Sequence, residues 1–126
     1  KVEITHEEYE ASKGKEIFIS ANDTSQDILL GFVRLRIPYK PFRSEITPGS
    51  AGIRELHVYG QATSLQDIGQ VQHHGLGKQL MLEAEKIAKE KYNIKKLLVI
   101  SGIGVKEYYR NLGYKDDGVY VSKILS

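Results

Sequence analysis

The chain has 126 residues, a formal net charge of +2 and no cysteine, with 40% hydrophobic and 27% charged residues. This composition is typical of a globular protein with a real core, and we expect residues 1–126 to form one domain. The absence of cysteine excludes disulfides, iron–sulfur ligation and a cysteine nucleophile, and it fits a reducing compartment. No apolar run approaches the length of about 18 residues that predicts a membrane span.

The first half of the chain predicts strands. Residues 2–12 mix charged and apolar side chains and predict an edge strand. Residues 16–20 and 28–37 predict the two strands of a hairpin, separated by polar turn residues at 22–27. Three prolines and two glycines in 38–52 predict a loop.

The second half alternates strands and helices. Residues 53–59 predict a strand, 76–92 an amphipathic helix and 96–101 a strand buried on both faces. A second helix ends at Gly113, and 118–125 predict a last strand with alternating apolar residues that include Val119, Val121 and Ile124. The strand–helix–strand order implies a parallel pair joined by a right-handed crossover.

The periodicity also predicts which side chains are buried. The first helix should bury Leu76, Leu80, Ala84, Ile87 and Ala88, and the second Val105, Tyr108, Tyr109 and Leu112. In the strand at 53–59, Arg54, Leu56 and Val58 should share one face and Glu55, His57 and Tyr59 the other.

A glycine-containing hexapeptide, Gln72-His73-His74-Gly75-Leu76-Gly77, lies where a loop becomes the first helix. Free N–H groups in the first turn and the helix dipole favour an anion there, and we expect a Cβ at either glycine to block close approach or forbid the required φ. The spacing matches neither a P-loop nor a dinucleotide fingerprint. The adjacent histidines lack a cysteine or a spaced histidine partner, so no metal site is predicted.

The remaining pattern, Gln-x-x-Gly-x-Gly, resembles the pyrophosphate-binding signature of the GNAT acetyltransferases, which hold acetyl-coenzyme A (acetyl-CoA). Residues 54–60 (RELHVYG), 97–102 (LLVISG) and 108–114 (YYRNLGY) resemble further parts of that family. Together they resemble the C-terminal acetyltransferase-like domain of the catalytic subunit of Elongator, which modifies the wobble uridine of tRNA. The similarity is concentrated in residues 52–125.

The resemblance implies the GNAT fold, an α/β (α+β) architecture with a mixed, mostly antiparallel sheet and helices packed on it. Two parallel central strands splay apart in this fold, and the pantetheine arm of the cofactor adds like a strand into the gap. The chain departs from the family by lacking a clear helical pair after its first strand, which leaves the acceptor side unassigned.

The resemblance also implies residue roles. Acetyl-CoA contacts are expected in the glycine loop and first helical turn and along the splayed strand: Gln72, Gly75, Leu76, Gly77, Lys78, Glu55, Leu56, His57 and Val58. Tyr109 matches the tyrosine that contacts the cofactor and donates a proton to its thiolate, and Tyr108 would position the acetyl group. Either Glu55 or His57 would act as a base or relay. From the residues alone, core packing for the tyrosines and a surface pair for Glu55 and His57 stay open.

The implied function is that of an acyltransferase: a cytoplasmic, acetyl-CoA-binding domain of a tRNA wobble-uridine carboxymethyl-modifying enzyme. It would supply the acetyl group by thioester hydrolysis or transfer. The implied partners are tRNA and a radical-SAM domain of the same longer protein, which would hold the iron–sulfur cluster and S-adenosylmethionine. The alternatives are a protein lysine acetyltransferase and a non-catalytic scaffold that docks tRNA or partner subunits.

A net charge of +2 does not by itself indicate a nucleic-acid-binding protein, but the basic residues are unevenly placed. Arg34, Arg36, Lys40 and Arg43 lie within ten residues that contain no acid. This run is either a solvated strand and loop or a contact for RNA phosphates.

Overall fold

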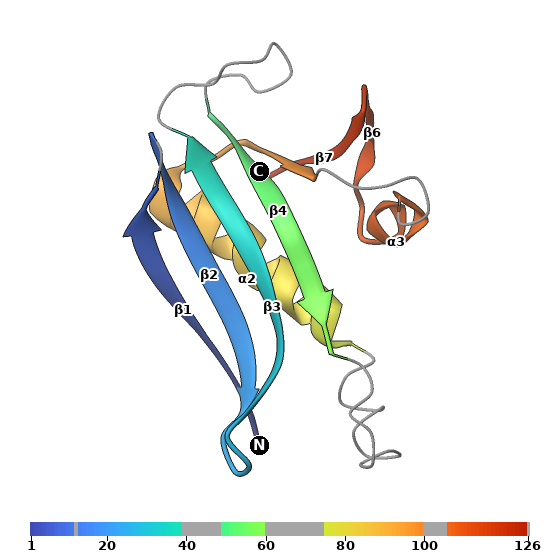
Figure 1. The fold of residues 1–126 in the computed structure, drawn as a ribbon. Helices are drawn as coiled ribbons and strands as arrows, with labels where there is room; N and C mark the ends of the chain where they lie inside the picture. The colour runs from blue at the N-terminus through green and yellow to red at the C-terminus, as the bar shows by residue number, and fades with distance from the viewer. Residues whose placement is uncertain (12, 39–48, 60–74, 100–105, 126) are drawn as a thin grey trace.

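The computed structural model of the chain describes residues 1–11, 13–38, 49–59, 75–99 and 106–125. Within them, seven strands form one sheet in the order β1-β2-β3-β4-β5-β7-β6 (Figure 1). The strands are β1 (Val2–Glu10), β2 (Gly14–Asp23), β3 (Ile28–Pro38), β4 (Ser50–Val58), β5 (Lys96–Val99), β6 (Lys115–Asp117) and β7 (Tyr120–Ile124). The helices are α2 (Leu76–Tyr92) and α3 (Lys106–Asn111). Neither of these helices is long and apolar enough to cross a membrane.

The sheet is antiparallel except where β4 meets β5, which confirms the predicted parallel pair. That pairing runs from Ser50↔Lys96 to Ile53↔Val99. β4 continues to Val58 paired with β3 alone, and the described residues place no strand along its other edge. Among the described residues, the second half of β4 therefore has an open edge on the side of β5, where the two parallel strands are expected to diverge.

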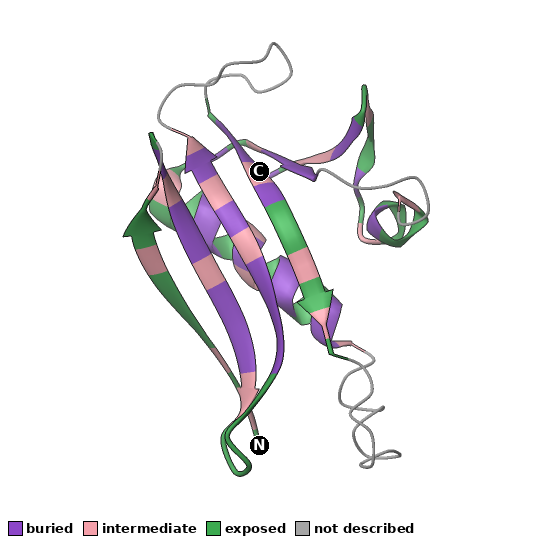
Figure 2. Ribbon diagram, in the orientation of Figure 1, coloured by how far each residue is buried: buried purple, intermediate pink, exposed green. Residues whose placement is uncertain are grey.

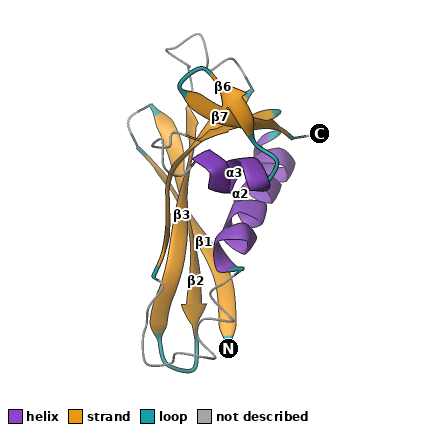
Figure 3. Cartoon of the chain, turned by 90° about the vertical axis from the view of Figure 1, so that its right-hand side faces the viewer, coloured by secondary structure: helices purple, strands orange, loops and turns teal. Residues whose placement is uncertain are grey.

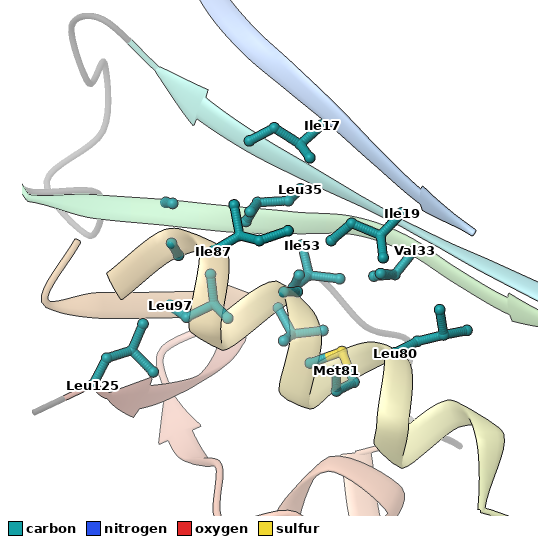
Figure 4. Packing of buried hydrophobic residues seen from close by; sticks show 14 of the residues in the cluster. Ile17, Ile19, Val33, Leu35, Ile53, Leu80, Met81, Ile87, Leu97 and Leu125 are labelled. Carbon is teal, nitrogen blue, oxygen red and sulfur yellow. The ribbon is translucent and has the colours of Figure 1, made fainter. Parts of the chain in front are cut away.

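The core lies between the sheet and α2 (Figure 4). All five side chains predicted for the buried face of α2 are buried, and Met81 joins them. They pack on alternate residues of the sheet, which include Ile17, Ile19, Val33, Leu35 and Ile53. Figure 3 shows that α2 and α3 lie on the same side of the sheet, and Figure 2 shows the buried stripe of α2 turned toward the strands.

A β-bulge changes the predicted faces of β4. The register pairs Arg34 with Glu55 and Leu35 with Ile53, so Arg54 is an extra residue on β4. Its side chain donates to Glu16, 3.3 Å away, whereas Leu56 and Val58 pack against the core. The prediction that Arg54 shares a face with Leu56 and Val58 was wrong, because a bulge interrupts the alternation of the strand.

The C-terminal region also differs from the prediction. β6 was not predicted, since its three residues, Lys115–Asp117, are all charged and carry no apolar signal. Val119 and Ile124 are 67% and 66% exposed, and only Val121 of the expected alternating set is buried. Val119 lies between the two strands, directly after Gly118, whose φ of +64° marks the turn of a short hairpin.

Candidate functional site

The N-terminus of α2 presents backbone donors for which the described residues supply no acceptor. Its N-cap, Gly75, offers no side-chain hydrogen bond, and the first turn contains no acidic residue. Within the described part of the chain, no acceptor is found for the N–H groups of Leu76, Gly77 and Lys78. Leu76 and Gly77 are buried, so an external acceptor with negative charge is the natural partner for these donors.

Gly77 lies where α2, α3 and β4 converge. A Cβ at this position would clash with the hydroxyl oxygen of Tyr108 and would lie 3.7 Å from Cγ2 of Val58. A side chain at position 77 would therefore displace Tyr108, and close approach of a ligand to Gly77 stays a prediction. Gly75 differs, because its φ is −102° and no described atom lies within 4 Å of the Cβ position. Of the two reasons given for a glycine here, a special φ therefore does not apply to Gly75, and close approach of a ligand stays a prediction.

The open edge of β4 directs backbone groups toward the same region. The N–H of Tyr59 donates to the carbonyl of Leu30 on β3, at 2.9 Å. In an antiparallel pair, alternate residues point their N–H and C=O groups to the same neighbour. The amides of Leu56 and Val58 therefore point away from β3, toward the side on which no described strand pairs with them.

The two tyrosines of α3 have different environments. Tyr109 is 7% exposed, its ring packs edge-on against Tyr108 and Tyr114, and its hydroxyl has no hydrogen-bond partner among the described residues. Burial, with a contribution from Tyr108, raises the pKa of Tyr109 to about 12. Tyr108 is 41% exposed, which contradicts its predicted place on the buried stripe. The reason is that α3 turns only its Tyr109 side to the core, so Tyr108 faces the N-terminus of α2.

Glu55 and His57 lie on the opposite face of β4 from Leu56 and Val58. Glu55 is exposed and accepts a hydrogen bond from Nε of Arg34, at 3.2 Å. The His57 ring stacks on Phe32, with 5.9 Å between ring centroids, and its centroid lies 4.4 Å from that of Tyr59. The structure thus separates these two side chains from the buried N-terminus of α2, while their strand runs beside it.

Two arginines of the predicted basic run form ion pairs within the sheet. Arg34 pairs with Glu55, and Arg36 donates to the buried carboxylate of Glu16, at 3.0 Å. Both arginines therefore have partners inside the chain. Lys78 is exposed on the first turn of α2. The remaining predicted positions, Gln72, His73, His74, Lys40 and Arg43, lie outside the described residues.

These features fit a ligand that is anionic at one end and carries a thioester at the other. Buried donors at the start of α2 suit a phosphate group, and the close approach at Gly77 leaves no room for a side chain. The edge of β4 that no described strand covers suits an extended arm that contains amides. The hydroxyl of Tyr109, which has no partner among the described residues, can donate a proton. We call the first-turn donors of Leu76, Gly77 and Lys78 the cradle.

A model of the acetyltransferase (GNAT) family matches residues 2–114. The chain belongs to this family. Membership implies binding of an acyl-CoA, and the mixed sheet with its parallel pair confirms the expected GNAT fold.

The relatives of this GNAT chain confirm the narrower resemblance. It is 54% identical over 98% of its length to a tRNA uridine(34) acetyltransferase of Methanocaldococcus infernus, and 44% identical over 99% to Elongator complex protein 3 of Homo sapiens. It spans only 24% and 23% of these two proteins.

Solved structures agree with this placement. The structure of archaeal Methanocaldococcus infernus Elp3 with an N-terminal deletion has a TM-score of 0.86 at 54% identity, over 98% of this chain and 30% of that one. A putative N-acetyltransferase from Lactobacillus plantarum has a TM-score of 0.60 at 16% identity, over 88% of this chain and 70% of that one, and shares the fold alone.

The sequence reasoning missed the surroundings of Tyr109. Tyr114 is 2% exposed and packs edge-on against it, and Glu85 and Lys123 bond to each other beside Tyr114. Tyr114 is the last residue of the 108–114 motif, and this motif was the one sequence signal for Tyr114. Glu85 and Lys123 carry no pattern of their own, because their meeting depends on how α2 and β7 pack.

Proposed function

We propose that this GNAT chain is the acetyl-CoA-binding domain of a tRNA wobble-uridine carboxymethyl-modifying enzyme, to which it supplies the acetyl group by thioester hydrolysis or transfer. The observation that carries the proposal is the cradle, whose N–H groups have no acceptor among the described residues and lie beside the open edge of β4 and Tyr108 of α3. The substrate class follows from relatives that are about half identical over almost the whole chain.

The cofactor-binding residues fall into two groups. The N–H groups of Leu76, Gly77 and Lys78 would hold the pyrophosphate, with Gln72 and Gly75 from the preceding loop. The backbone of β4 from Glu55 to Val58 would hold the pantetheine arm, because its Leu56 and Val58 amides lack a strand partner in the described chain. The same amides are suited to stabilise charge on a carbonyl oxygen.

Acetyl-CoA supplies an acetyl group that is activated as a thioester. Tyr109 would give its phenolic proton to the thiolate. A phenol is protonated at neutral pH, and burial raises the pKa of Tyr109 further, to about 12. Tyr108 would position the acetyl group, since its hydroxyl lies against Gly77. Glu55 or His57 would act on the acceptor from the opposite face of β4.

The partners we propose are a tRNA and the rest of a longer protein. The chain spans about a quarter of its relatives, so a radical-SAM domain with its iron–sulfur cluster and S-adenosylmethionine would lie elsewhere in the same polypeptide. Residues 1–126 would form one domain of that protein, which would act in the cytoplasm. The domain would release acetyl groups only when tRNA is engaged.

A calorimetric titration with acetyl-CoA, desulfo-CoA and ATP tests the proposal. Acetyl-CoA at a free concentration of a hundred times its Kd should raise the free energy of unfolding by about 2.7 kcal/mol. Acetyl-CoA and desulfo-CoA should bind much more tightly than ATP, because both carry the pantetheine arm. Equal affinity for ATP would reduce the cradle to a general phosphate site and contradict the proposal.

Turnover provides the second test. Release of coenzyme A from acetyl-CoA by the complete protein should rise when its tRNA is added. A high rate without tRNA would argue against the proposed coupling, and steady acetylation of a lysine peptide that Glu55→Gln abolishes would favour the protein acetyltransferase instead.

A further inference from the structure

A group of polar side chains lies directly behind the tyrosine pair. The Tyr114 hydroxyl donates to Oε2 of Glu85, at 2.7 Å. Nζ of Lys123 donates to both Glu85 oxygens, at 3.2 and 3.3 Å. Glu85 comes from α2, Tyr114 follows α3 and Lys123 comes from β7, so one carboxylate links three separate elements. We call these three residues the Glu85 anchor.

The anchor holds a helix that is too short to be stable alone. α3 has six residues, and isolated helices of that length do not persist in water. Its C-terminal end is closed at Gly113, with φ of +98°, where the N–H of Tyr114 donates to the carbonyl of Tyr109, at 3.0 Å. Nζ of Lys123 also donates to the carbonyl of Leu112, at 3.1 Å. Two members of the anchor therefore bond to the end of α3.

Tyr114 also contacts Tyr109 through its side chain. The two rings pack edge-on, with centroids 6.0 Å apart and planes at 72°. With the backbone bond from Tyr114 to the Tyr109 carbonyl, this contact makes the position of Tyr109 depend on that of Tyr114. Tyr114 is in turn fixed by Glu85.

Glu85 and the cradle belong to the same helix. The distance along α2 from residue 77 to residue 85 is about 12 Å, at about 1.5 Å per residue. A rigid helix thus carries the proposed phosphate site at one point and the anchor for α3 at another. The anchor thus joins the helix that carries the proposed phosphate site to the end of the helix that carries Tyr109.

We propose that Glu85 is a positioning residue that acts through Tyr114 and Lys123 to hold the Tyr109 hydroxyl where it can transfer a proton to a thiolate bound beside the cradle. The inference rests on the proposed function, in which Tyr109 is the donor. Displacing a reacting group by about 1 Å can lower a rate by about 10²-fold. Ligand affinity should change little, because the cradle is formed by the backbone of α2 itself.

The molecule contains a matched control at the other end of α2. The Tyr92 hydroxyl donates to Oε1 of Glu8, and Lys91 pairs with the same carboxylate. Tyr92→Phe therefore removes a phenol-to-carboxylate bond of the same kind, far along the helix from the cradle. Tyr114→Phe removes the corresponding bond in the anchor and keeps the buried ring.

The experiment measures tRNA-stimulated release of coenzyme A and the Kd for acetyl-CoA in the complete protein. Tyr114→Phe and Glu85→Gln should each lower kcat by about tenfold or more. Their Kd for acetyl-CoA should stay within about twofold of the parent, a difference of less than about 0.5 kcal/mol. Tyr92→Phe should leave both quantities unchanged.

A double variant separates positioning from a loss of stability. If Tyr114 acts through Tyr109, then Tyr114→Phe should have almost no further effect on kcat in a Tyr109→Phe background. Equal losses in both backgrounds, or parallel losses in kcat and affinity, would overturn the inference. If Tyr109→Phe slows the reaction but Tyr114→Phe and Glu85→Gln do not, the positioning role alone fails. If the parent protein neither binds acetyl-CoA nor releases coenzyme A with tRNA, the proposed function fails instead.

Discussion

The two ends of α2 differ in how their backbone groups are satisfied. At the C-terminus, Asn93 adopts the left-handed conformation with φ of 53°. Its N–H donates to the carbonyl of Lys89, and the N–H of Ile94 donates to the carbonyl of Ala88. Lys89 and Lys91 place positive charge in the last turn, as the helix dipole favours. At the N-terminus, Gly75 provides no cap, and the first turn has no acid. One end is completed by the chain itself, whereas the described residues supply no acceptor for the donors at the other end, where we propose a ligand.

The largest effect is expected from filling the incomplete end. Gly77→Glu places a side chain against Tyr108 and a negative charge where we propose a pyrophosphate. We expect acetyl-CoA affinity to fall by more than about 10²-fold, from the combined loss of space and of charge complementarity. Calorimetry measures the affinity, and thermal unfolding of the same variant shows whether the fold is retained. Unchanged binding by Gly77→Glu would show that the cradle is not the phosphate site.

Removing the proposed proton donor should affect the rate and not the affinity. Tyr109→Phe should lower tRNA-dependent coenzyme A release by about 10²-fold, a typical contribution of general acid catalysis. Because the pKa of Tyr109 is raised to about 12, the parent rate should show no ionisation of this phenol below about pH 11. A pH–rate profile with a tyrosine-dependent fall near neutral pH would contradict this role.

At the completed end, stability should change without any effect on the ligand. Asn93→Ala forces alanine into the left-handed region and should destabilise the fold by about 1 kcal/mol, whereas Asn93→Gly should be neutral or slightly stabilising. Thermal unfolding measures both variants. An altered Kd for acetyl-CoA in either one would mean that the two ends of α2 are not independent.

The smallest effect concerns the contact of β1 with the last turn of α2. Hydrogen bonds from Lys91 and then Tyr92 lower the pKa of Glu8 below its usual value of 4.5. The stability that this carboxylate contributes is therefore present above that pH and is lost as the pH falls through the lower folded pKa. Glu8→Gln should reduce stability at pH 7 and flatten its decline in acid, as urea unfolding at several pH values can show. If Glu8→Gln loses stability in acid as steeply as the parent, then other carboxylates cause that loss.

The elements with strong periodicity could be predicted from the sequence. The apolar stripe of α2, the stop at Asn93 and the continuous apolar run of β5 each carry a local signal that tertiary packing reinforced. The position of Gly77 at a helix N-terminus was equally visible, because the amphipathic pattern begins at Leu76, directly after the polar loop.

The parts that could not be predicted depend on neighbours distant in sequence. Arg54 left its expected face because of a bulge opposite Arg34, which no pattern in β4 reveals. Tyr108 and Tyr109 are adjacent and chemically identical, so only the packing of α3 decides that one is buried and the other faces Gly77. β6 has no apolar residue, although Asp117-Gly118 is a turn signal that could have indicated its hairpin.

The half-open strand β4 also offers a direct readout of occupancy. Amides that point into an empty slot are free to exchange with solvent deuterium, whereas those bonded to β3 are shielded. Filling the slot with an extended ligand would slow exchange at Leu56 and Val58 and leave Glu55 and His57 almost as before. Alternate residues of one strand would thus report separately on the ligand and on the sheet.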